Sequence, residues 1–472
     1  MADKRPNVIL VMTDQHRGDC LGIEGHPCLL TPNLDAIAYA GTRFTQGFST
    51  CPVCIPARRS LMSGQFPATH GVLGFCDGLE WNPPATLPGE LSKAGYQTFI
   101  VGRSMHLHPS RKRYGFDHMV LSGDVHPDDV VEHLPGGPAS SWGHGLDPNG
   151  WTARPWHLDE TLHPTYRTAN DAIRFLNRRD PSCPFFLCVN FAGPHPPFYP
   201  PAFYMDRYLR QDLPTPSYGS WATAPAGEGK GLLINDHTQH LTGEALRSCQ
   251  AGYYGLINHI DDQIHRFLSP WGGLDAKTAE NTVILFVADH GEMLGDHYLC
   301  RKSSPYQGAV RVPFFIKGPS HWQLPTAQTC STAVCLEDIM PTILELADVP
   351  IPESVEGKSL VPILKGESQI KRDYVHGEQA TPPDDRLCFH YITDGSCKYI
   401  WFTNTGVEQF FDLQNDPNEC TNLVDSEDHQ QAVSMWRKRL VEHLKNRPEG
   451  FSDGTKLQPG KSCPLVMDHA KN

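Results

Sequence analysis

The chain has 472 residues and a formal net charge of -13, from 53 acidic and 40 basic side chains. This length suits one large domain with an appendage, or two or three domains, and it excludes a small disulfide-stabilised protein. Hydrophobic residues make up 39% of the chain, which is typical of a globular protein. The net acidity argues against nucleic acids and anionic membranes as partners, so an anionic substrate would need a locally positive pocket.

Cysteine usage and the amino-terminal segment predict a cytoplasmic protein. The 15 cysteines are an odd number, and several of them lie among apolar residues, as reduced and buried thiols do. The apolar run NVILVM near the amino terminus is too short for a signal-peptide core or a membrane span. A periplasmic or secreted protein whose leader had been removed would look much the same.

Four apolar runs along the chain are each followed by a carboxylate or an imidazole side chain, which can act in catalysis or bind a metal. Each run is short and rich in β-branched or aromatic residues, which predicts strands buried in a parallel or mixed sheet. Helical patterns lie between them, for example over residues 31–41 and 165–179. This alternation predicts an α/β fold. The residues that follow the four runs are Asp14, His106, His195 and Asp289.

These four side chains can converge on one site although they are distant in sequence. In an α/β sheet, ligands bind outside the carboxyl ends of the strands, where successive strands bring such residues together. A turn or a helix cap is the ordinary role for any one of them. A carboxylate or an imidazole at four strand ends favours a shared site for the set.

The segment TCPVCIPARRSLMSG places a cysteine at the start of a predicted helix. Pro56, two residues after Cys54, is favoured in a first helical turn, and Gly64 ends the helix. At a helix amino terminus, unpaired N–H groups and the helix dipole favour anions and lower the pKa of a thiol. Arg58, about one turn further on, is expected to reach back to the same place.

Two other interpretations of this cysteine remain open. Cys51 and Cys54 form a C-x-x-C pair, which in cytosolic proteins can be a redox pair or half of a zinc site. The chain has no second C-x-x-C, and the segment does not follow a thioredoxin-like first strand. The other alternative is a buried structural thiol, which leaves the arginine pair Arg58 and Arg59 unexplained.

The motif CIPARRSLMSG resembles the signature of the type I sulfatase family, Cys-x-Pro-x-Arg followed by a small-residue turn and glycine. The resemblance covers almost the whole chain in the expected order. It implies an alkaline phosphatase-like fold, in which a large mixed, mostly parallel sheet lies between helices. The further segments that resemble the family are 6–22 (first metal strand), 31–50 (lead-in to the nucleophile), 287–319 (second metal strand and lysine loop) and 408–423 (carboxy-terminal domain).

Two domains are expected. A catalytic sulfatase-like domain is predicted over residues 1–370, and a smaller carboxy-terminal domain over residues 371–472. The smaller domain contains three strand-like segments and a helical pattern over 430–446, which predicts an antiparallel sheet with one helix. The segment 202–240 is rich in Pro, Gly and aromatic residues without periodicity. It is interpreted as a substrate-binding loop or as a plain surface excursion.

The resemblance implies a modified cysteine and a metal ion. A maturation enzyme converts the cysteine to formylglycine, whose hydrated aldehyde is the nucleophile. Oxygen ligands suit calcium, whereas an imidazole nitrogen leaves manganese as an alternative metal. The implied metal ligands are Asp14, Gln15, the modified Cys54, Asp289 and His290.

Two of these ligands depart from the familiar sulfatase pattern. Gln15 stands where a second Asp is common, and His290 stands where Asn is common. The same departure occurs in related phosphonate monoester hydrolases and phosphodiesterases that share the formylglycine. Hydrolysis of phosphonate monoesters or phosphodiesters on the same scaffold is therefore the alternative function.

The reaction implied is the hydrolysis of a sulfate monoester by double displacement, with a covalent sulfo-enzyme intermediate. A hydroxyl of the hydrated aldehyde, activated by the metal and oriented by Arg58 and His106, attacks sulfur. His195 and Lys302 are implied to bind the sulfate and to protonate the departing alcohol. Arg103 either contacts the sulfate in place of a family lysine or faces solvent as an ordinary strand-end arginine.

The sequence leaves the nature of the alcohol open: a sugar, an aryl group or a small molecule. A third hypothesis is a non-catalytic anion-binding relative or a redox protein, in which Cys54 stays a thiol. For Glu292 and His297 a supporting or capping role is expected. Neither the oligomeric state nor a role for His16 and His108 is indicated.

Overall fold

The computed structural model describes residues 5–121, 146–225, 237–367, 370–381 and 388–471. Its centre is an eight-stranded sheet formed by β1 (Asn7–Asp14), β2 (Thr42–Phe44), β4 (Gln97–Gly102), β5 (His118–Leu121), β6 (Phe185–Pro194), β7 (Thr282–Ala288), β9 (Phe314–Lys317) and β10 (Gln328–Cys330). The strand order is β10-β2-β9-β7-β1-β6-β4-β5. The five strands from β7 to β5 are parallel, and β9 pairs with β7 in the antiparallel sense. This confirms the mixed, mostly parallel sheet.

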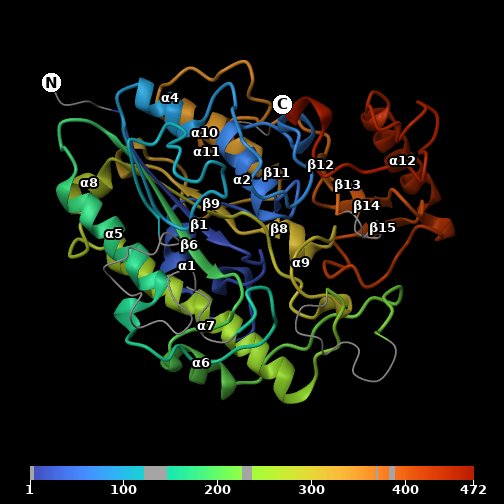
Figure 1. The fold of residues 1–472 in the computed structure, drawn as a ribbon, viewed down its shortest axis with the longest axis horizontal. Coiled ribbons are helices and arrows are strands. Elements are labelled where there is room, and N and C mark those ends of the chain that lie inside the picture. The colour runs from blue at the N-terminus through green and yellow to red at the C-terminus, as the bar shows by residue number, and fades with distance from the viewer. Residues whose placement is uncertain (1–4, 122–145, 226–236, 368–369, 382–387, 472) are drawn as a thin grey trace.

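Helices cover both faces of this sheet (Figure 1). One face packs against α1 (Pro32–Tyr39), α5 (Pro164–Arg178) and α7 (Gly243–Leu268). The other face packs against α2 (Cys54–Ser63), α4 (Leu87–Lys93) and α10 (Ile339–Leu346). The two helical patterns expected from the sequence between the first and third strands correspond to α1 and α5.

The residues of β1 show why its sequence is apolar without alternation. Val8, Leu10 and Met12 lie in the core cluster beside α2, α4 and α10. Ile9 and Val11 lie in the cluster beside α1, α5 and α7. Because successive side chains of a strand point to opposite faces, a strand with helices on both sides needs apolar residues at every position.

Local signals explain the helix boundaries. Pro164 is the first residue of α5, where its missing N–H is not needed, and the side chain of His163 accepts a hydrogen bond from the Thr165 N–H. Gly64 follows α2 with φ of 67°, a left-handed conformation that favours glycine at a helix end. The predicted end of α2 is therefore correct.

A second, four-stranded antiparallel sheet lies beside the large one (right in Figure 1). It consists of β12 (Val375–Gln379), β13 (Phe389–Thr393), β14 (Cys397–Phe402) and β15 (Glu408–Asp412), and α12 (Gln430–Leu444) packs onto it. The sequence predicted the last three strands and the helix but missed β12. The domain boundary near residue 370 stays a prediction.

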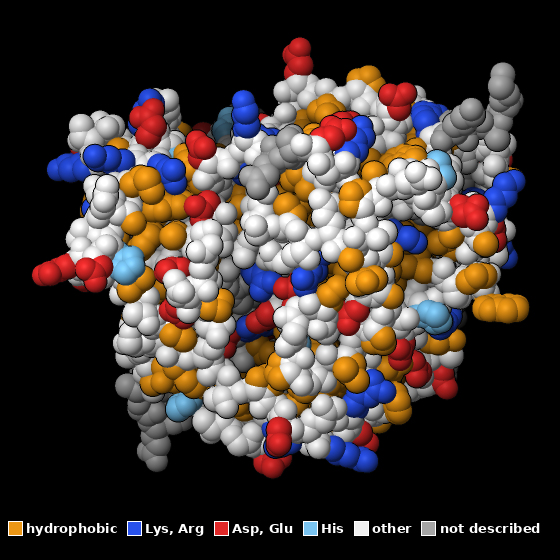
Figure 2. Space-filling model, turned by 180° about the vertical axis from the view of Figure 1, so that it is seen from behind, with side chains coloured by type: hydrophobic (Ala, Val, Ile, Leu, Met, Phe, Trp, Pro, Cys, Tyr) orange, Lys and Arg blue, Asp and Glu red, His pale blue; other side chains and the backbone are white. Residues whose placement is uncertain are grey.

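The remaining elements are short. A three-stranded sheet of order β11-β3-β8 lies beside the large sheet. None of the helices in the described ranges is long and apolar enough to cross a membrane. On the face seen in Figure 2, Lys and Arg side chains are interspersed with Asp and Glu. The short elements are β3 (Gly47–Phe48), β8 (Arg311–Val312), β11 (Val334–Cys335), α3 (Pro67–His70), α6 (Ala202–Leu209), α8 (Ala276–Glu280), α9 (Gln307–Val310) and α11 (Val361–Leu364).

Candidate active site

The predicted site residues lie at the carboxyl edge of the large sheet, where neighbouring parallel strands end side by side. Asp14 is the last residue of β1, and Asp289 follows β7 directly. His195 follows β6, and His106 comes shortly after β4. Because β7, β1, β6 and β4 are consecutive in the sheet, their carboxyl ends bring the four side chains to one edge.

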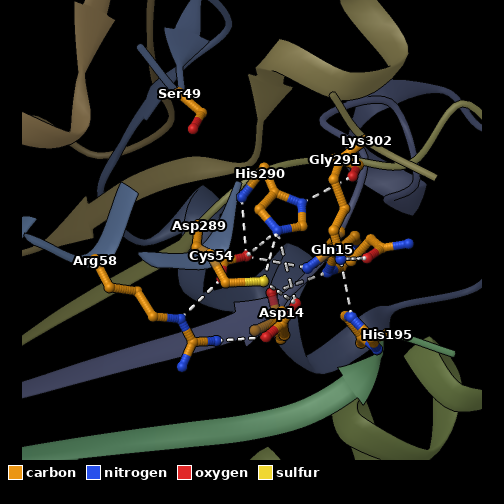
Figure 3. Close-up of polar contacts among 12 residues, drawn as sticks. Asp14, Gln15, Ser49, Cys54, Arg58, His195, Asp289, His290, Gly291 and Lys302 are labelled. Carbon is orange, nitrogen blue, oxygen red and sulfur yellow. Dashed lines mark hydrogen bonds and ion pairs between the residues drawn. The ribbon is translucent and has the colours of Figure 1, made fainter. Parts of the chain in front are cut away.

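Cys54 is the first residue of α2, and its thiol points at this edge (Figure 3). Its Sγ lies 3.2 Å from His290 Nε2 and 3.9 Å from Asp14 Oδ1. Burial and the Asp14 carboxylate act to raise the pKa of the thiol, but Lys302 and His290 outweigh them and lower it. The pKa is lowered as expected, although the charges responsible are Lys302 and His290 rather than Arg58.

Arg58 reaches the two carboxylates instead of the thiol. Its Nε donates to Asp289 Oδ2 at 2.9 Å, and its Nη2 donates to Asp14 Oδ2 at 2.5 Å. All three side chains are fully buried. Burial acts to raise the pKa of Asp14, but Arg103, Arg58 and two histidines hold it well below its usual range. The Asp14 carboxylate is therefore kept ionised inside the protein.

The four buried residues Asp14, Cys54, Asp289 and His290 fit one divalent cation. Each offers one ligand atom, and these atoms all lie within 4.8 Å of one another. Arg58 holds the Oδ2 atoms of both carboxylates, so each Oδ1 faces His290 Nε2, at 3.8 and 3.7 Å. The two carboxylates supply oxygen ligands, which hard cations prefer, and His290 adds an imidazole nitrogen.

Gln15 connects this cluster to Lys302 and His195. The carboxamide oxygen of Gln15 accepts a hydrogen bond from Lys302 Nζ at 2.7 Å, and the amide nitrogen donates to Glu292. Lys302 Nζ also lies 2.9 Å from His195 Nε2. The oxygen of Gln15 thus lies against Lys302, and its role as a metal ligand stays a prediction. Glu292 orients Gln15, as a supporting residue does.

Arg103 and His106 both face the site. Arg103 Nη1 lies 3.1 Å from Asp14 Oδ2, and Arg103 Nε donates to His106 Nε2 at 3.2 Å. The side chain of Arg103 is only 13% exposed, so it is not a solvated strand-end arginine. Burial, followed by the charges of Arg103 and Arg58, holds the pKa of His106 well below its usual value. His106 is therefore neutral at pH 7 and accepts at Nε2.

Tyr253 on α7 supports the site and was missed in the sequence. Its hydroxyl donates to the Gln15 carbonyl at 2.8 Å and accepts from the Arg17 N–H at 3.0 Å. Gln15 has φ of 66°, a conformation rare for residues other than glycine. A tyrosine inside a helix pattern carries no sequence signal for this contact, because the partner lies far away in the chain.

The two cysteines of the C-x-x-C pair lie in different surroundings. Cys51 Sγ donates to the Leu73 carbonyl at 3.5 Å, and burial raises the pKa of this thiol well above its usual value. All 15 cysteines lie in the described ranges, and every one is a free thiol. The geometry gives no support to a redox pair of Cys51 and Cys54.

The predicted substrate-binding segment 202–240 is described only in part, because residues 226–236 lie outside the described ranges. In the described part, Trp221 stacks on Tyr306, with ring centroids 4.5 Å apart, and packs against His297. His297 Nδ1 accepts a hydrogen bond from the Gly219 N–H at 3.0 Å. His297 therefore contacts the described part of this segment, and both its supporting role at the site and the role of the segment stay predictions.

Comparison with known proteins identifies the family. The sulfatase family model matches residues 6–349, and the model for the N-sulphoglucosamine sulphohydrolase carboxy-terminal region matches residues 295–446. An arylsulfatase of Clostridium perfringens is 42% identical, covering 97% of this chain and 98% of that protein. A choline-sulfatase of Rhizobium meliloti is 28% identical over 90% of this chain and 84% of its own length.

Solved structures agree with this assignment. The phosphonate monoester hydrolase of Agrobacterium radiobacter has a TM-score of 0.77 at 25% identity, covering 93% of this chain and 95% of that one. A structure solved with its substrate D-glucosamine-2-N,6-O-disulfate has a TM-score of 0.75 at 23% identity, over 94% and 99%, and shows the shared fold. A divalent metal and a cysteine-derived formylglycine are typical of this family. The chain is a sulfatase and belongs to the type I sulfatase family of the alkaline phosphatase superfamily.

Proposed function

We propose that this sulfatase hydrolyses sulfate monoesters of small-molecule or carbohydrate alcohols, with a formylglycine made from Cys54 as its nucleophile. The observation that carries the proposal is the position of Cys54, at the start of a buried helix, with Sγ facing His290 and Asp14. The arylsulfatase that is 42% identical along nearly its whole length supports the same reaction. A formylglycine-generating enzyme is the partner that maturation requires.

The proposed metal is calcium, held by Asp14, Asp289, His290 and the modified Cys54, with Gln15 as the further predicted ligand. A bound divalent cation supplies positive charge that favours an ionised hydroxyl nucleophile and offsets charge on the sulfate oxygens. The carboxylate oxygens favour calcium, and the imidazole keeps manganese as the alternative. Metal analysis of the purified matured protein, followed by chelation and readdition of each ion, distinguishes the two.

The cationic residues of the site have distinct proposed tasks. Arg58 fixes the orientation of both metal-binding carboxylates through its bonds to their Oδ2 atoms. Arg103 and Lys302 place positive charge where the sulfate oxygens would lie. These three cations make the pocket locally more positive than the rest of a protein whose net charge is -13, and neutral His106 accepts a hydrogen bond from Arg103.

His195 and Lys302 form the proposed proton donor for the departing alcohol. His195 Nδ1 lies 2.6 Å from the Pro196 carbonyl, which requires the proton to be on Nδ1 and leaves Nε2 to accept from Lys302 Nζ. Burial and the charges of Lys302 and Arg103 hold the pKa of His195 well below its usual value. The mobile proton of the pair therefore starts on the ammonium of Lys302, from which it passes to the alkoxide as the sulfate bond breaks.

The proposal is tested by maturation and by substitution of the nucleophile. Protein produced with a formylglycine-generating enzyme should contain an aldehyde in the peptide spanning Cys54, detected by mass analysis. Cys54→Ala should lower kcat/KM for 4-nitrophenyl sulfate by roughly 10⁴-fold or more, because the nucleophile is lost. Full activity of a protein whose Cys54 is still a thiol, or of Cys54→Ala, would contradict the mechanism.

Hydrolysis of phosphonate monoesters is the second candidate, favoured by the likeness to the phosphonate monoester hydrolase fold. Sulfate carries one negative charge in a monoester, as phosphonate monoesters and phosphodiesters do, so the same cationic site accepts all three. The comparison of kcat/KM for aryl sulfate, aryl phosphonate and diester substrates separates the candidates. A higher value for sulfate is expected.

A further inference from the structure

An exposed aromatic side chain lies at the outer edge of the site. Phe75 is 55% exposed, and its ring meets that of His106 edge-on, with centroids 6.5 Å apart. His106 in turn contacts Arg103, which reaches the buried Asp14. Among the large exposed apolar side chains of the described ranges, Phe75 is the one that makes a ring contact with a predicted site residue.

The chain on the amino-terminal side of Phe75 is fixed by backbone contacts. The Leu73 N–H donates to the Leu465 carbonyl at 2.8 Å, and the Leu73 carbonyl accepts from the Ala380 N–H at 2.7 Å. Gly74 comes so close to these segments that a Cβ there would lie 2.2 Å from the Ala380 carbonyl oxygen. The backbone that carries Phe75 is therefore held in place from the small antiparallel sheet and the carboxy-terminal segment.

Arg59 fixes the other side of the same loop, and this explains the arginine pair. Arg59 Nη2 donates to the Leu79 carbonyl at 2.8 Å, and its guanidinium lies 5.4 Å from the centre of the Trp81 ring. Burial lowers the pKa of Arg59 to about 10. Arg58 points to the carboxylates and Arg59 to the loop 73–81. Phe75 is thus presented to solvent by a preorganised loop.

We propose that Phe75 forms one wall of a subsite for the alcohol part of the substrate, and that this subsite takes an aromatic alcohol. The inference rests on the proposed sulfatase function. The groups that would receive the sulfate, Arg103, Lys302 and His195, lie deep in the site and are mostly buried. A substituent that extends outward past His106 meets Phe75, because the exposed Phe75 ring contacts the ring of His106.

The chemistry of Phe75 favours an aromatic substituent over a hydroxylated one. Binding is favoured when a flat apolar ring packs on the half-exposed phenyl ring, because both ring surfaces are removed from water. Edge-to-face or offset contacts between the two aromatic rings add further stabilisation. A sugar presents hydroxyl groups that lose hydrogen bonds to water on the same surface. The subsite is expected to strengthen substrate binding without changing the reacting atoms, so its effect belongs in KM rather than in kcat.

Binding in the absence of turnover gives the direct test. In a Cys54→Ala background with calcium present, Phe75→Ala should weaken binding of 4-nitrophenyl sulfate about tenfold by calorimetry. Inorganic sulfate has no alcohol part, so its Kd should change less than about twofold. Phe75→Tyr should bind like the parent protein. The matched control is Trp271→Ala, because Trp271 is an exposed aromatic residue outside the predicted site segments, and its Kd values should equal those of the parent protein.

Turnover by the matured enzyme gives the second readout. Phe75→Ala should raise KM for 4-nitrophenyl sulfate about tenfold and keep kcat within about threefold. An unchanged Kd and KM would overturn the subsite, and so would an equal loss of affinity for inorganic sulfate, which would mean that Phe75 only shapes the sulfate pocket. If the matured wild-type protein hydrolysed no sulfate ester, the proposed function would fail, while the Kd comparison would still decide the subsite.

Discussion

At the scale of single residues, the site depends on one guanidinium that bridges two buried carboxylates. Asp14 and Asp289 are fully buried, and ionised carboxylates so close together repel each other. Arg58 offsets this repulsion and also fixes which oxygen of each carboxylate faces the cluster. Its planar fork suits this double contact, which the single charge of a lysine does not reproduce. The arginine of the sulfatase motif therefore organises the two carboxylates that are proposed to bind the metal.

Replacement of this arginine by lysine tests the bridging role. Arg58→Lys keeps the charge but reaches one carboxylate at a time, so kcat/KM of the matured enzyme should fall roughly 10²-fold or more. The free energy of unfolding, measured in urea, should also fall by about 2–4 kcal/mol, because one buried carboxylate is left with a poorer partner. Arg59→Lys is the matched control, and its kcat should stay within about threefold because Arg59 faces the loop 73–81. Equal effects of the two substitutions would show that bridging is not needed.

The sequence predicted the inner residues of the site better than its rim. Strand ends pointed to Asp14, His106, His195 and Asp289, because parallel strands deliver such residues to one edge whatever their separation in the chain. Local sequence patterns cannot reveal Phe75, because the position of its loop depends on contacts with distant segments. The same holds for Tyr253, whose hydroxyl meets the backbone of Gln15 across the fold. The inner residues were predictable by topology and motif, whereas the supporting ones depend on tertiary contacts.

At the scale of elements, the strands predicted from the sequence were those with apolar runs, and β12 was missed because it has none. Its residues VHGEQ are polar at most positions, yet all five are buried. The polar side chains are buried because they have partners: His376 Nε2 lies 3.1 Å from His390 Nδ1, and Glu378 pairs with Arg447 at 2.8 Å. These contacts form only in the folded state, so hydrophobic periodicity does not reveal them.

The histidine pair of this sheet predicts a loss of stability in acid. Burial holds the pKa values of His376 and His390 well below the usual value, with further contributions from Arg447 and His443, while Glu378 lies 3.9 Å from His390. A folded pKa below the unfolded one means that the unfolded chain binds more protons. The stability is therefore present above about pH 6.5 and is lost as the pH falls below it.

Urea unfolding at pH 7 and pH 5 measures this effect. The wild-type free energy of unfolding should fall by about 1 kcal/mol or more between these values for each buried histidine. His390→Gln removes one of the titrating groups, so the difference between the two pH values should shrink. His321→Gln, at an exposed histidine, is the control and should keep the wild-type difference. A pH dependence that His390→Gln leaves unchanged would assign the effect to other groups.

At the scale of the whole molecule, the small sheet contacts the segment that leads to Cys54. The Tyr391 hydroxyl donates to the Ser49 carbonyl at 2.8 Å, and the Glu378 N–H donates to the Thr50 carbonyl at 2.7 Å. These residues come just before Cys54 in the chain. The carboxy-terminal sheet is therefore part of the framework of the site, and the two sheets cannot be treated as independent units in this protein.

A buried ion pair in the carboxy-terminal part of the chain lies against the segment that follows Lys302. Lys398 of β14 lies 2.7 Å from Glu419, and its Nζ donates to the Pro305 carbonyl at 2.9 Å, close to Lys302 in sequence. Both side chains of the pair are at most 1% exposed. Lys398→Met leaves Glu419 charged and unpaired in the interior. The free energy of unfolding should therefore fall by about 3–5 kcal/mol in urea titrations.

A double variant that removes both charges distinguishes the contribution of the ion pair from that of packing. Lys398→Met with Glu419→Gln removes both charges, so the double variant should be more stable than Lys398→Met alone, by about 1 kcal/mol or more. Arg437→Met breaks the partly exposed pair of Arg437 with Glu408 on the same sheet, and should lower stability by less than about 1 kcal/mol. If the double variant were the less stable of the two, the loss would come from packing and hydrogen bonds of Lys398 itself.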